Sequence, residues 1–180
     1  LRVERKLPVA HNIDVQVAPA HVLVGSLSIK PSHVNIVGPQ STVDTMEYIA
    51  TDTLRLDDVR DDVDEQISLS TGGDNLWTLG QRSVRVQADV QILADNDMAG
   101  VPVAIRNAGG RRLRADPEFV TVKVRGGVGV VSNLNPQADL NLYVNYVPFQ
   151  EENYPVLSPD GDALFEILEI TPSQVNIVSR

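Results

Sequence analysis

The 180-residue chain is long enough for one mid-sized domain or for two small ones of about 90 residues each. It contains no cysteine, which excludes disulfides, thiolate metal sites and cysteine nucleophiles. Its formal net charge is −9, with 13 acidic and eight basic residues in 1–94 and 11 and seven in 95–180. An acidic surface on both halves repels phosphate backbones, so we do not expect nucleic acid as a partner.

The apolar residues favour β-structure. The chain is 42% hydrophobic but only 4% aromatic, and 27 valines and 10 isoleucines dominate the apolar set. β-Branched side chains are stiff and pack well on pleated strands. In the first half, apolar residues alternate with polar ones in four stretches, and this period of two predicts half-buried strands around residues 13–17, 22–24, 34–36 and 84–90.

One segment of the first half predicts a short helix. Ser41 can serve as its N-cap, and Val43, Met46 and Ile49 follow at three-residue spacing. We therefore expect about two helical turns over residues 41–49, held by packing.

The second half repeats the first. Residues 6–12 are echoed by 100–107, each around a Pro-Val-Ala sequence, and the Pro-x-x-Val-x-(Ile/Val) motif at Pro31 recurs at Pro117. The spacing predicts two tandem domains, 1–95 and 96–180, joined by the polar stretch 93–100. Strands are predicted over residues 101–105, 119–124, 140–147, 165–170 and 175–178, with a hairpin turn at 107–110 and a loop or a single turn at 126–131, where glycines weaken a helix.

The motif of the first half, Pro31-x-x-Val34-x-Ile36-x-Gly38-Pro39 followed by apolar residues three apart, resembles the YbbR-like domain family. The second half departs from the motif, because Arg125-Gly126-Gly127 stands in place of Gly-Pro. The resemblance covers nearly the whole chain. It implies a mainly β fold of two tandem small β-rich domains with one or two short helices each, similar to the C-terminal domain of the L25 ribosomal protein family.

The resemblance also implies a location and a role. YbbR-like domains are typical of the outer face of the bacterial cytoplasmic membrane, behind an N-terminal transmembrane helix, and studied members regulate a membrane diadenylate cyclase. The chain starts at Leu1, and we interpret it as a fragment of a membrane-tethered envelope protein. The family provides no catalytic residues to transfer.

Sequence motifs that would indicate catalysis or metal binding are weak in this chain. The acids Asp57, Asp58, Asp61, Asp62, Asp64 and Glu65 come in pairs without the glycine of a calcium loop, and we interpret them as a solvated acidic loop. Residues 95–106 begin like a calcium loop but place Ala99 at a ligand position and Arg106 where the closing glutamate belongs. His11, His21 and His33 are the only histidines, and nothing indicates that they converge on a metal. We therefore expect no catalytic, cofactor-binding or metal-binding residues, no cofactor and no enzyme.

Two features have alternative interpretations. Arg106, Arg111, Arg112 and Arg114 surround the turn at 107–110, and they either contact an acidic partner or anionic lipid headgroups, or oppose sheet aggregation at an edge strand. The sole tryptophan, Trp77, either anchors an interface or packs over one end of its own core. In both cases we favour the structural interpretation.

Three functional classes remain to be compared. An enzyme lacks support from the residues, and an L25-like RNA-binding module lacks positive charge and aromatic residues. We therefore expect a non-catalytic extracytoplasmic protein-interaction module, with a membrane protein such as a diadenylate cyclase as its partner and cyclic di-AMP signalling as its output. Strand edges and loops, including residues 106–114, are the expected contact surfaces.

Overall fold

The computed structural model describes residues 1–71, 76–159 and 164–180, and it is mainly β, as predicted. The chain divides into two compact units, which we call unit 1 (Leu1–Gln91) and unit 2 (Ile92–Arg180). The boundary predicted after residue 95 lies four residues beyond this division. That each unit is a YbbR-like domain remains a prediction.

The polar stretch 93–100 is a strand and not a linker, contrary to the expectation from its composition. It lies within β7 (Ser83–Arg106), whose second part pairs with β9 (Phe119–Gly127) from Leu93 to Pro102. Asp97 is exposed while its neighbour Met98 is buried. Asp95 and Asp97 thus lie on the exposed face of a strand, and an assignment of a linker from composition could not detect the partner strand that pairs with it.

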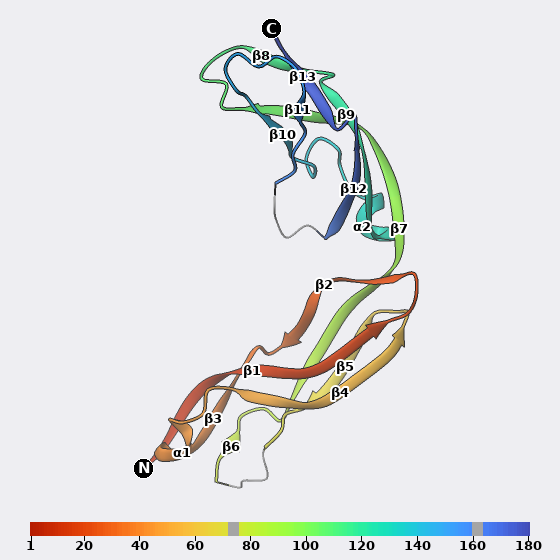
Figure 1. Cartoon of the computed structure of the whole chain (residues 1–180). Helices are drawn as coiled ribbons and strands as arrows, with labels where there is room; N and C mark the ends of the chain where they lie inside the picture. The colour runs from red at the N-terminus through yellow and green to blue at the C-terminus, as the bar shows by residue number, and fades with distance from the viewer. Residues whose placement is uncertain (72–75, 160–163) are drawn as a thin grey trace. The chain divides into compact units, whose positions relative to one another are not determined.

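Unit 1 contains two groups of paired strands (Figure 1). One is a sheet of order β4-β1-β3-β6, and in the other β2 and β5 both pair with β7. The elements in chain order are β1 (Arg2–Val17), β2 (His21–Lys30), β3 (His33–Pro39), α1 (Gln40–Val43), β4 (Ile49–Val59), β5 (Val63–Ser68), β6 (Thr78–Leu79) and the first part of β7.

Unit 2 repeats this arrangement with the next elements of the chain. Its order β10-β7-β9-β12 matches β4-β1-β3-β6, and its three-stranded sheet β11-β13-β8 matches the pairing of β5 and β2 with β7. Besides the second part of β7, its elements are β8 (Leu113–Asp116), β9 (Phe119–Gly127), α2 (Val128–Ser132), β10 (Leu142–Asn145), β11 (Tyr154–Pro155), β12 (Phe165–Thr171) and β13 (Gln174–Ser179).

The opening strand of each unit changes partner at its Pro-Val pair. In β1, Pro8 is the last residue paired antiparallel with β3, and Val9 is the first paired parallel with β4. In β7, Pro102 and Val103 make the same change from β9 to β10. Proline has no N–H to donate to a ladder, and the point where one ladder ends and another begins tolerates this loss. In both units, the Pro-Val-Ala sequence therefore marks the place where the opening strand changes its pairing partner.

The Pro-x-x-Val motif also occurs at equivalent turns in the structure. Pro31, Pro117 and Pro172 each follow a strand, at the turns β2–β3, β8–β9 and β12–β13. In each case the valine three residues later is buried in the next strand: Val34, Val120 and Val175.

Each unit has its own apolar core, made mainly of the alternating strand residues. In unit 1, one cluster of buried side chains consists of Leu7, Val34, Ile36, Val43, Ile49, Leu69 and Val84. In unit 2, valines of β7 and β9, Leu140, Leu142 and the deeply buried Tyr154 form the corresponding cluster. Burying a valine or leucine side chain stabilises a fold by about 1.5–3 kcal/mol, so these positions hold the sheets together.

The helix predicted over residues 41–49 is wrong in its length. Only α1 (Gln40–Val43) is helical, it has no side-chain cap, and Ile49 already belongs to β4. Val43, Met46 and Ile49 all reach the core, so the three-residue spacing arises from a turn followed by a strand. The guanidinium of Arg5 donates to the carbonyl oxygens of Val43, Asp44 and Met46 at 3.1–3.3 Å, which satisfies the end of this single turn.

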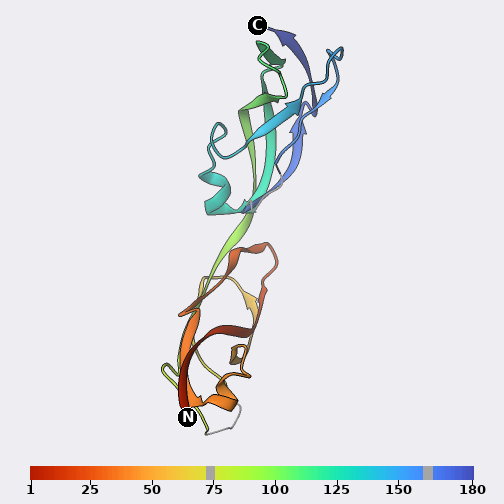
Figure 2. The same ribbon diagram turned by 90° about the vertical axis from the view of Figure 1, so that its left-hand side faces the viewer.

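The glycine-rich segment of unit 2 contains the matching turn, α2 (Val128–Ser132), in agreement with the predicted loop or single turn. Figures 1 and 2 show α1 directly after β3 and α2 directly after β9. Asn96 on β7 donates to the carbonyl oxygen of Val131 at 3.0 Å, the position equivalent to Val43. Both described helices are very short, and neither is long and apolar enough to cross a bilayer.

The predicted hairpin at residues 107–110 is wrong, although the turn exists. Asn107, Gly109 and Gly110 have φ values of 63°, 63° and 80°, as a tight turn requires. However, the strands on its two sides enter different sheets: β7 pairs with β9 and β10, whereas β8 pairs with β13. The turn therefore connects two sheets, and local sequence could not show which partner each strand would choose.

Candidate functional site

Arg106, at the end of β7, and Arg111, in the connection to β8, lie against a tyrosine of the neighbouring strand β10 and the tyrosine directly after it. The guanidinium carbon of Arg106 lies 3.6 Å from the ring centroid of Tyr143, and that of Arg111 lies 5.2 Å from the ring centroid of Tyr146. Arg111 also donates from Nη1 to the Tyr146 hydroxyl at 2.8 Å. A guanidinium over an aromatic face is attracted by the ring electrons. We call these four residues the Arg–Tyr surface.

Backbone pairing places the two halves of this surface in register. β10 runs parallel to the end of β7, with Asn145 paired with Arg106, and the amide of Tyr146 donates to the Arg106 carbonyl at 2.9 Å. The turn at 107–110 then returns Arg111 to the same place. The tyrosines thus come from β10 and the residue after it, more than 30 residues away in sequence from the arginines they contact.

The arginines of this region have no carboxylate partner within the described residues. The five ion pairs there involve Arg55, Arg60, Arg85, Arg125 and Arg180, and none of them involves Arg106, Arg111, Arg112 or Arg114. Arg112 follows Arg111 directly in the chain, and Arg114 lies in the edge strand β8. Four exposed arginines that form no ion pair among the described residues are a local concentration of positive charge in a chain of net charge −9.

An exposed apolar tip follows the Arg–Tyr surface in the chain. Phe149 is fully exposed at a φ of 70°, and Val147 is about half exposed. The buried Tyr154 fixes the tip: its hydroxyl accepts the Val147 amide at 3.2 Å and lies 3.0 and 2.8 Å from the carbonyl oxygens of Val147 and Gln150. A bulky residue rarely adopts positive φ, and such a conformation persists where surrounding contacts fix it. We call residues 147–150 the Phe149 tip.

The acidic residues singled out from the sequence do not form a site. Asp57 and Asp58 lie in β4 and Asp64 and Glu65 in β5, so most of the predicted acidic loop is strand. Arg55 and Arg60 pair with the first two, Arg85 with Asp64, and Asp62 accepts the Val90 amide at 2.9 Å.

The histidines and the calcium-like stretch 95–106 are likewise not arranged as a metal site in the described residues. The ring of His21 is within 2.9 Å of the Pro19 carbonyl oxygen, and that of His33 is within 3.0 Å of the Ser32 hydroxyl. No group of three or more histidine, aspartate or glutamate side chains within residues 1–71, 76–159 and 164–180 is arranged to hold a metal ion. Asp95 and Asp97 lie in β7, and Asp95 is engaged by Arg125.

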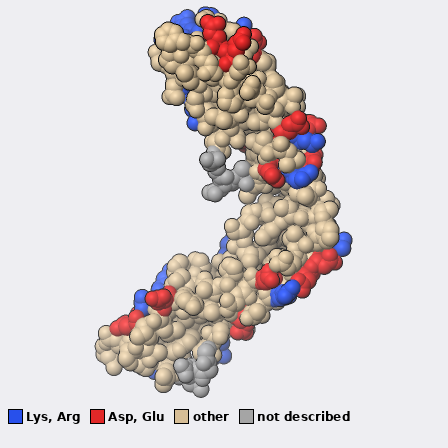
Figure 3. Space-filling view, viewed as in Figure 1, with Lys and Arg blue, Asp and Glu red and all other residues tan. Residues whose placement is uncertain are grey.

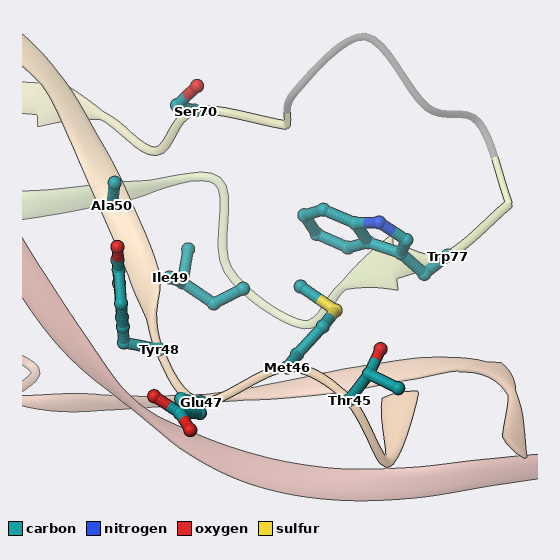
Figure 4. Close-up of a pocket in the computed structure, with 8 residues that line it drawn as sticks. All are labelled: Thr45, Met46, Glu47, Tyr48, Ile49, Ala50, Ser70 and Trp77. Atoms are coloured by element: carbon teal, nitrogen blue, oxygen red, sulfur yellow. The ribbon is translucent and has the colours of Figure 1, made fainter. Parts of the chain in front are cut away.

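Trp77 packs against the core of unit 1, which confirms the structural interpretation of this residue. It borders an open groove of about 430 Å³, in which Met46 lies beside the indole ring and Tyr48 lies at the other end (Figure 4). Trp77 would meet a side chain at Gly38, and Phe165 has the same relation to Gly126 in unit 2. The repeated aromatic position accounts for Trp77 by packing alone.

Sequence reasoning identified the arginines but missed their aromatic partners. Tyr143, Tyr146, Phe149 and Tyr154 lie within twelve residues of one another in a chain that is only 4% aromatic, and this local enrichment is the signal that could have indicated them. Their pairing with residues 106–111 depends on the parallel register of β10 with β7, which no local pattern encodes.

Comparisons with protein-family models and with curated proteins give no match. Among solved structures, the chain is similar to SuR18C from Streptococcus thermophilus (22% identity, covering 51% of this chain and 86% of that chain, TM-score 0.39). It is also similar to a YbbR-like protein from Streptococcus pneumoniae TIGR4 (10% identity, 98% and 93% covered, TM-score 0.36). The second structure carries the name of the family that the motif at Pro31 resembles.

Proposed function

We propose that this chain is a non-catalytic protein-interaction module. The observation that carries the proposal is the Arg–Tyr surface together with the fully exposed Phe149. Exposed arginines and aromatic residues are the residue types that dominate protein interfaces. Here one aromatic side chain is held away from the protein by a specific hydrogen-bond network, which supports a role outside the fold itself.

The partner and the location follow from the resemblance of the Pro31 motif to YbbR-like domains. On that basis the module belongs to a membrane-tethered protein at the extracytoplasmic face of a bacterial membrane, and it binds a membrane diadenylate cyclase. Its binding sets the output of cyclic di-AMP, and the module itself does not bind the nucleotide.

Co-purification tests this function. The full-length protein, tagged and expressed in its own organism, is extracted from membranes with mild detergent, and the diadenylate cyclase is expected among the bound proteins. A deletion strain is expected to have an altered level of cyclic di-AMP that the wild-type gene restores. Recovery without the cyclase, combined with an unchanged cyclic di-AMP level, contradicts the proposed function.

One observation favours a second candidate. Proteins bind single-stranded RNA by stacking its bases on aromatic rings or on arginine guanidinium planes, and the Arg–Tyr surface contains both residue types, as an L25-like module would require. The net charge of −9 opposes this function. Tight, salt-sensitive binding of single-stranded RNA by the purified chain would favour the second candidate over the first.

A further inference from the structure

We propose that the Arg–Tyr surface and the Phe149 tip form one docking site, and that its occupant is an acidic polypeptide segment carrying an apolar side chain. This inference rests on the proposed function, because it names the chemistry of the partner that the module binds. The arginines take the carboxylates of the segment, and Phe149 contacts its apolar side chain.

The side chains of Arg106 and Arg111 are already ordered for binding carboxylates before a partner binds. The tyrosine rings hold Arg106 and Arg111 in place, and the planar guanidinium retains N–H donors that point outward within its plane. Such donors bind a carboxylate through two parallel hydrogen bonds. Because the side chains are already ordered, binding loses less conformational entropy than it would with free arginines.

The conformation of the Phe149 tip is also fixed before a partner binds. A fully exposed phenyl ring contributes nothing to the core, and the Tyr154 hydroxyl fixes the backbone on both sides of it, at Val147 and Gln150. The two parts are contiguous, since Tyr146, which contacts Arg111, is followed directly by Val147. A partner that covers the tip therefore lies beside the arginines.

The surrounding charges favour a polypeptide over a membrane or a nucleic acid. Glu151 and Glu152 are exposed in the same loop, directly after the tip. Near the C-terminus, at the top of Figure 3, basic and acidic atoms lie side by side on the face shown. An anionic lipid surface or a phosphate backbone would approach these glutamates together with the arginines, at an electrostatic cost. A polypeptide can place its carboxylates at the arginines alone.

Binding of a labelled peptide tests the site. The probe is a short fluorescein-labelled peptide of glutamates around one central leucine, and its control replaces each glutamate by glutamine. Fluorescence anisotropy with the whole chain at low salt is expected to show at least tenfold tighter binding of the acidic peptide. Vesicles of phosphatidylglycerol and a single-stranded RNA are measured in parallel, and the proposal requires that neither binds through this surface.

Three variants locate the site. Arg106→Gln with Arg111→Gln is expected to weaken binding of the acidic peptide about tenfold. The matched control, Arg55→Gln with Arg60→Gln, changes the net charge equally in unit 1 and is expected to leave binding unchanged. Phe149→Gly removes the phenyl ring at a φ that glycine adopts readily, so it is expected to weaken binding several-fold without lowering the melting temperature.

The possible results distinguish a failure of the docking site from a failure of the proposed function. If both double variants bind the peptide equally, or if the 106/111 variant loses vesicle or RNA binding instead, the docking proposal is wrong. The same variants in the co-purification experiment distinguish the two proposals. A cyclase retained by the 106/111 variant overturns the docking site and leaves the function in place, whereas a cyclase absent from the wild-type sample counts against the function.

Discussion

Gly38 and Gly126 are equivalent residues at the points where β3 and β9 end and the short helices begin. A Cβ at Gly38 would lie 2.7 Å from the Cβ of Trp77 and 3.2 Å from a methyl carbon of Val43. A Cβ at Gly126 would lie 3.2 Å from the Cβ of Phe165 and 3.2 Å from a methyl carbon of Val131. Both glycines therefore allow an aromatic residue and a helix valine to close over the strand end, and the contact in unit 1 is the tighter one.

Gly38→Ala is expected to destabilise the protein by about 2 kcal/mol, because the Trp77 backbone would have to move. Gly126→Ala is expected to cost less. The control is Gly80→Ala, whose Cβ would meet Asn35 at 3.4 Å, an ordinary contact. Urea denaturation of the three variants measures the differences, and equal stabilities for Gly38→Ala and Gly80→Ala would contradict this account.

At the scale of elements, charged pairs connect neighbouring strands. Arg125 on β9 donates to both carboxylate oxygens of Asp95 on β7, at 2.7 and 3.1 Å, and Arg85 on β7 donates to Asp64 on β5 at 2.6 Å. These hydrogen bonds, with the charges of the arginines, hold the pKa values of both aspartates below their ordinary values. The pairs are exposed, so each adds little to stability.

The lowered pKa of Asp95 predicts in which direction the stability of the folded state changes with pH. A carboxylate with a lowered pKa in the folded state favours folding above its ordinary pKa of 3.8, and this contribution is lost as the pH falls through the lower, folded value. NMR titration of the Asp95 carboxyl is therefore expected to give a pKa below 3.8. Arg125→Gln is expected to raise this pKa, whereas Arg60→Gln leaves it unchanged, and an identical pKa in all three proteins would refute the assignment.

At the scale of the whole chain, one strand serves both units. The first part of β7 pairs with β5 in unit 1, and the second part pairs with β9 and β10 in unit 2. β13 takes in unit 2 the place that the first part of β7 takes in unit 1, since it pairs with β8 and β11. The chain therefore passes from one unit to the next within the single strand β7.

Limited proteolysis tests this continuity. Proteases cut segments that are exposed and not hydrogen-bonded, and residues 93–98 and 101–102 are paired with β9 on either side of a bulge at 99–100. With subtilisin, residues 92–102 are expected to remain intact until other sites, such as the turn at 107–112, have been cleaved. Mass spectrometry of the early fragments identifies the cuts, and a first cut within 92–102 would show that this segment behaves as a linker.

Local patterns determined the class of the fold and its repeated plan. Alternating valines and isoleucines predict strands because side chains on a strand point to opposite faces, and the buried residues of β3, β9 and β13 follow that alternation. The recurring Pro-Val-Ala and Pro-x-x-Val sequences indicated two copies because each marks a fixed event, a change of partner or a turn before a buried valine. The four arginines around the turn at 107–110 were also visible in the sequence.

Only the tertiary structure decided which segments meet. Residues 41–49 have helical spacing, yet they form a turn and a strand because β1 offers Ile49 a parallel partner. The turn at 107–110 has the glycines of a hairpin, yet β8 pairs with β13. The Arg–Tyr surface exists because β10 lies parallel to β7, and Phe149 points outward because the distant core holds Tyr154. Strand pairing and burial depend on contacts between residues far apart in sequence, and the free energy of those contacts overrides local propensity.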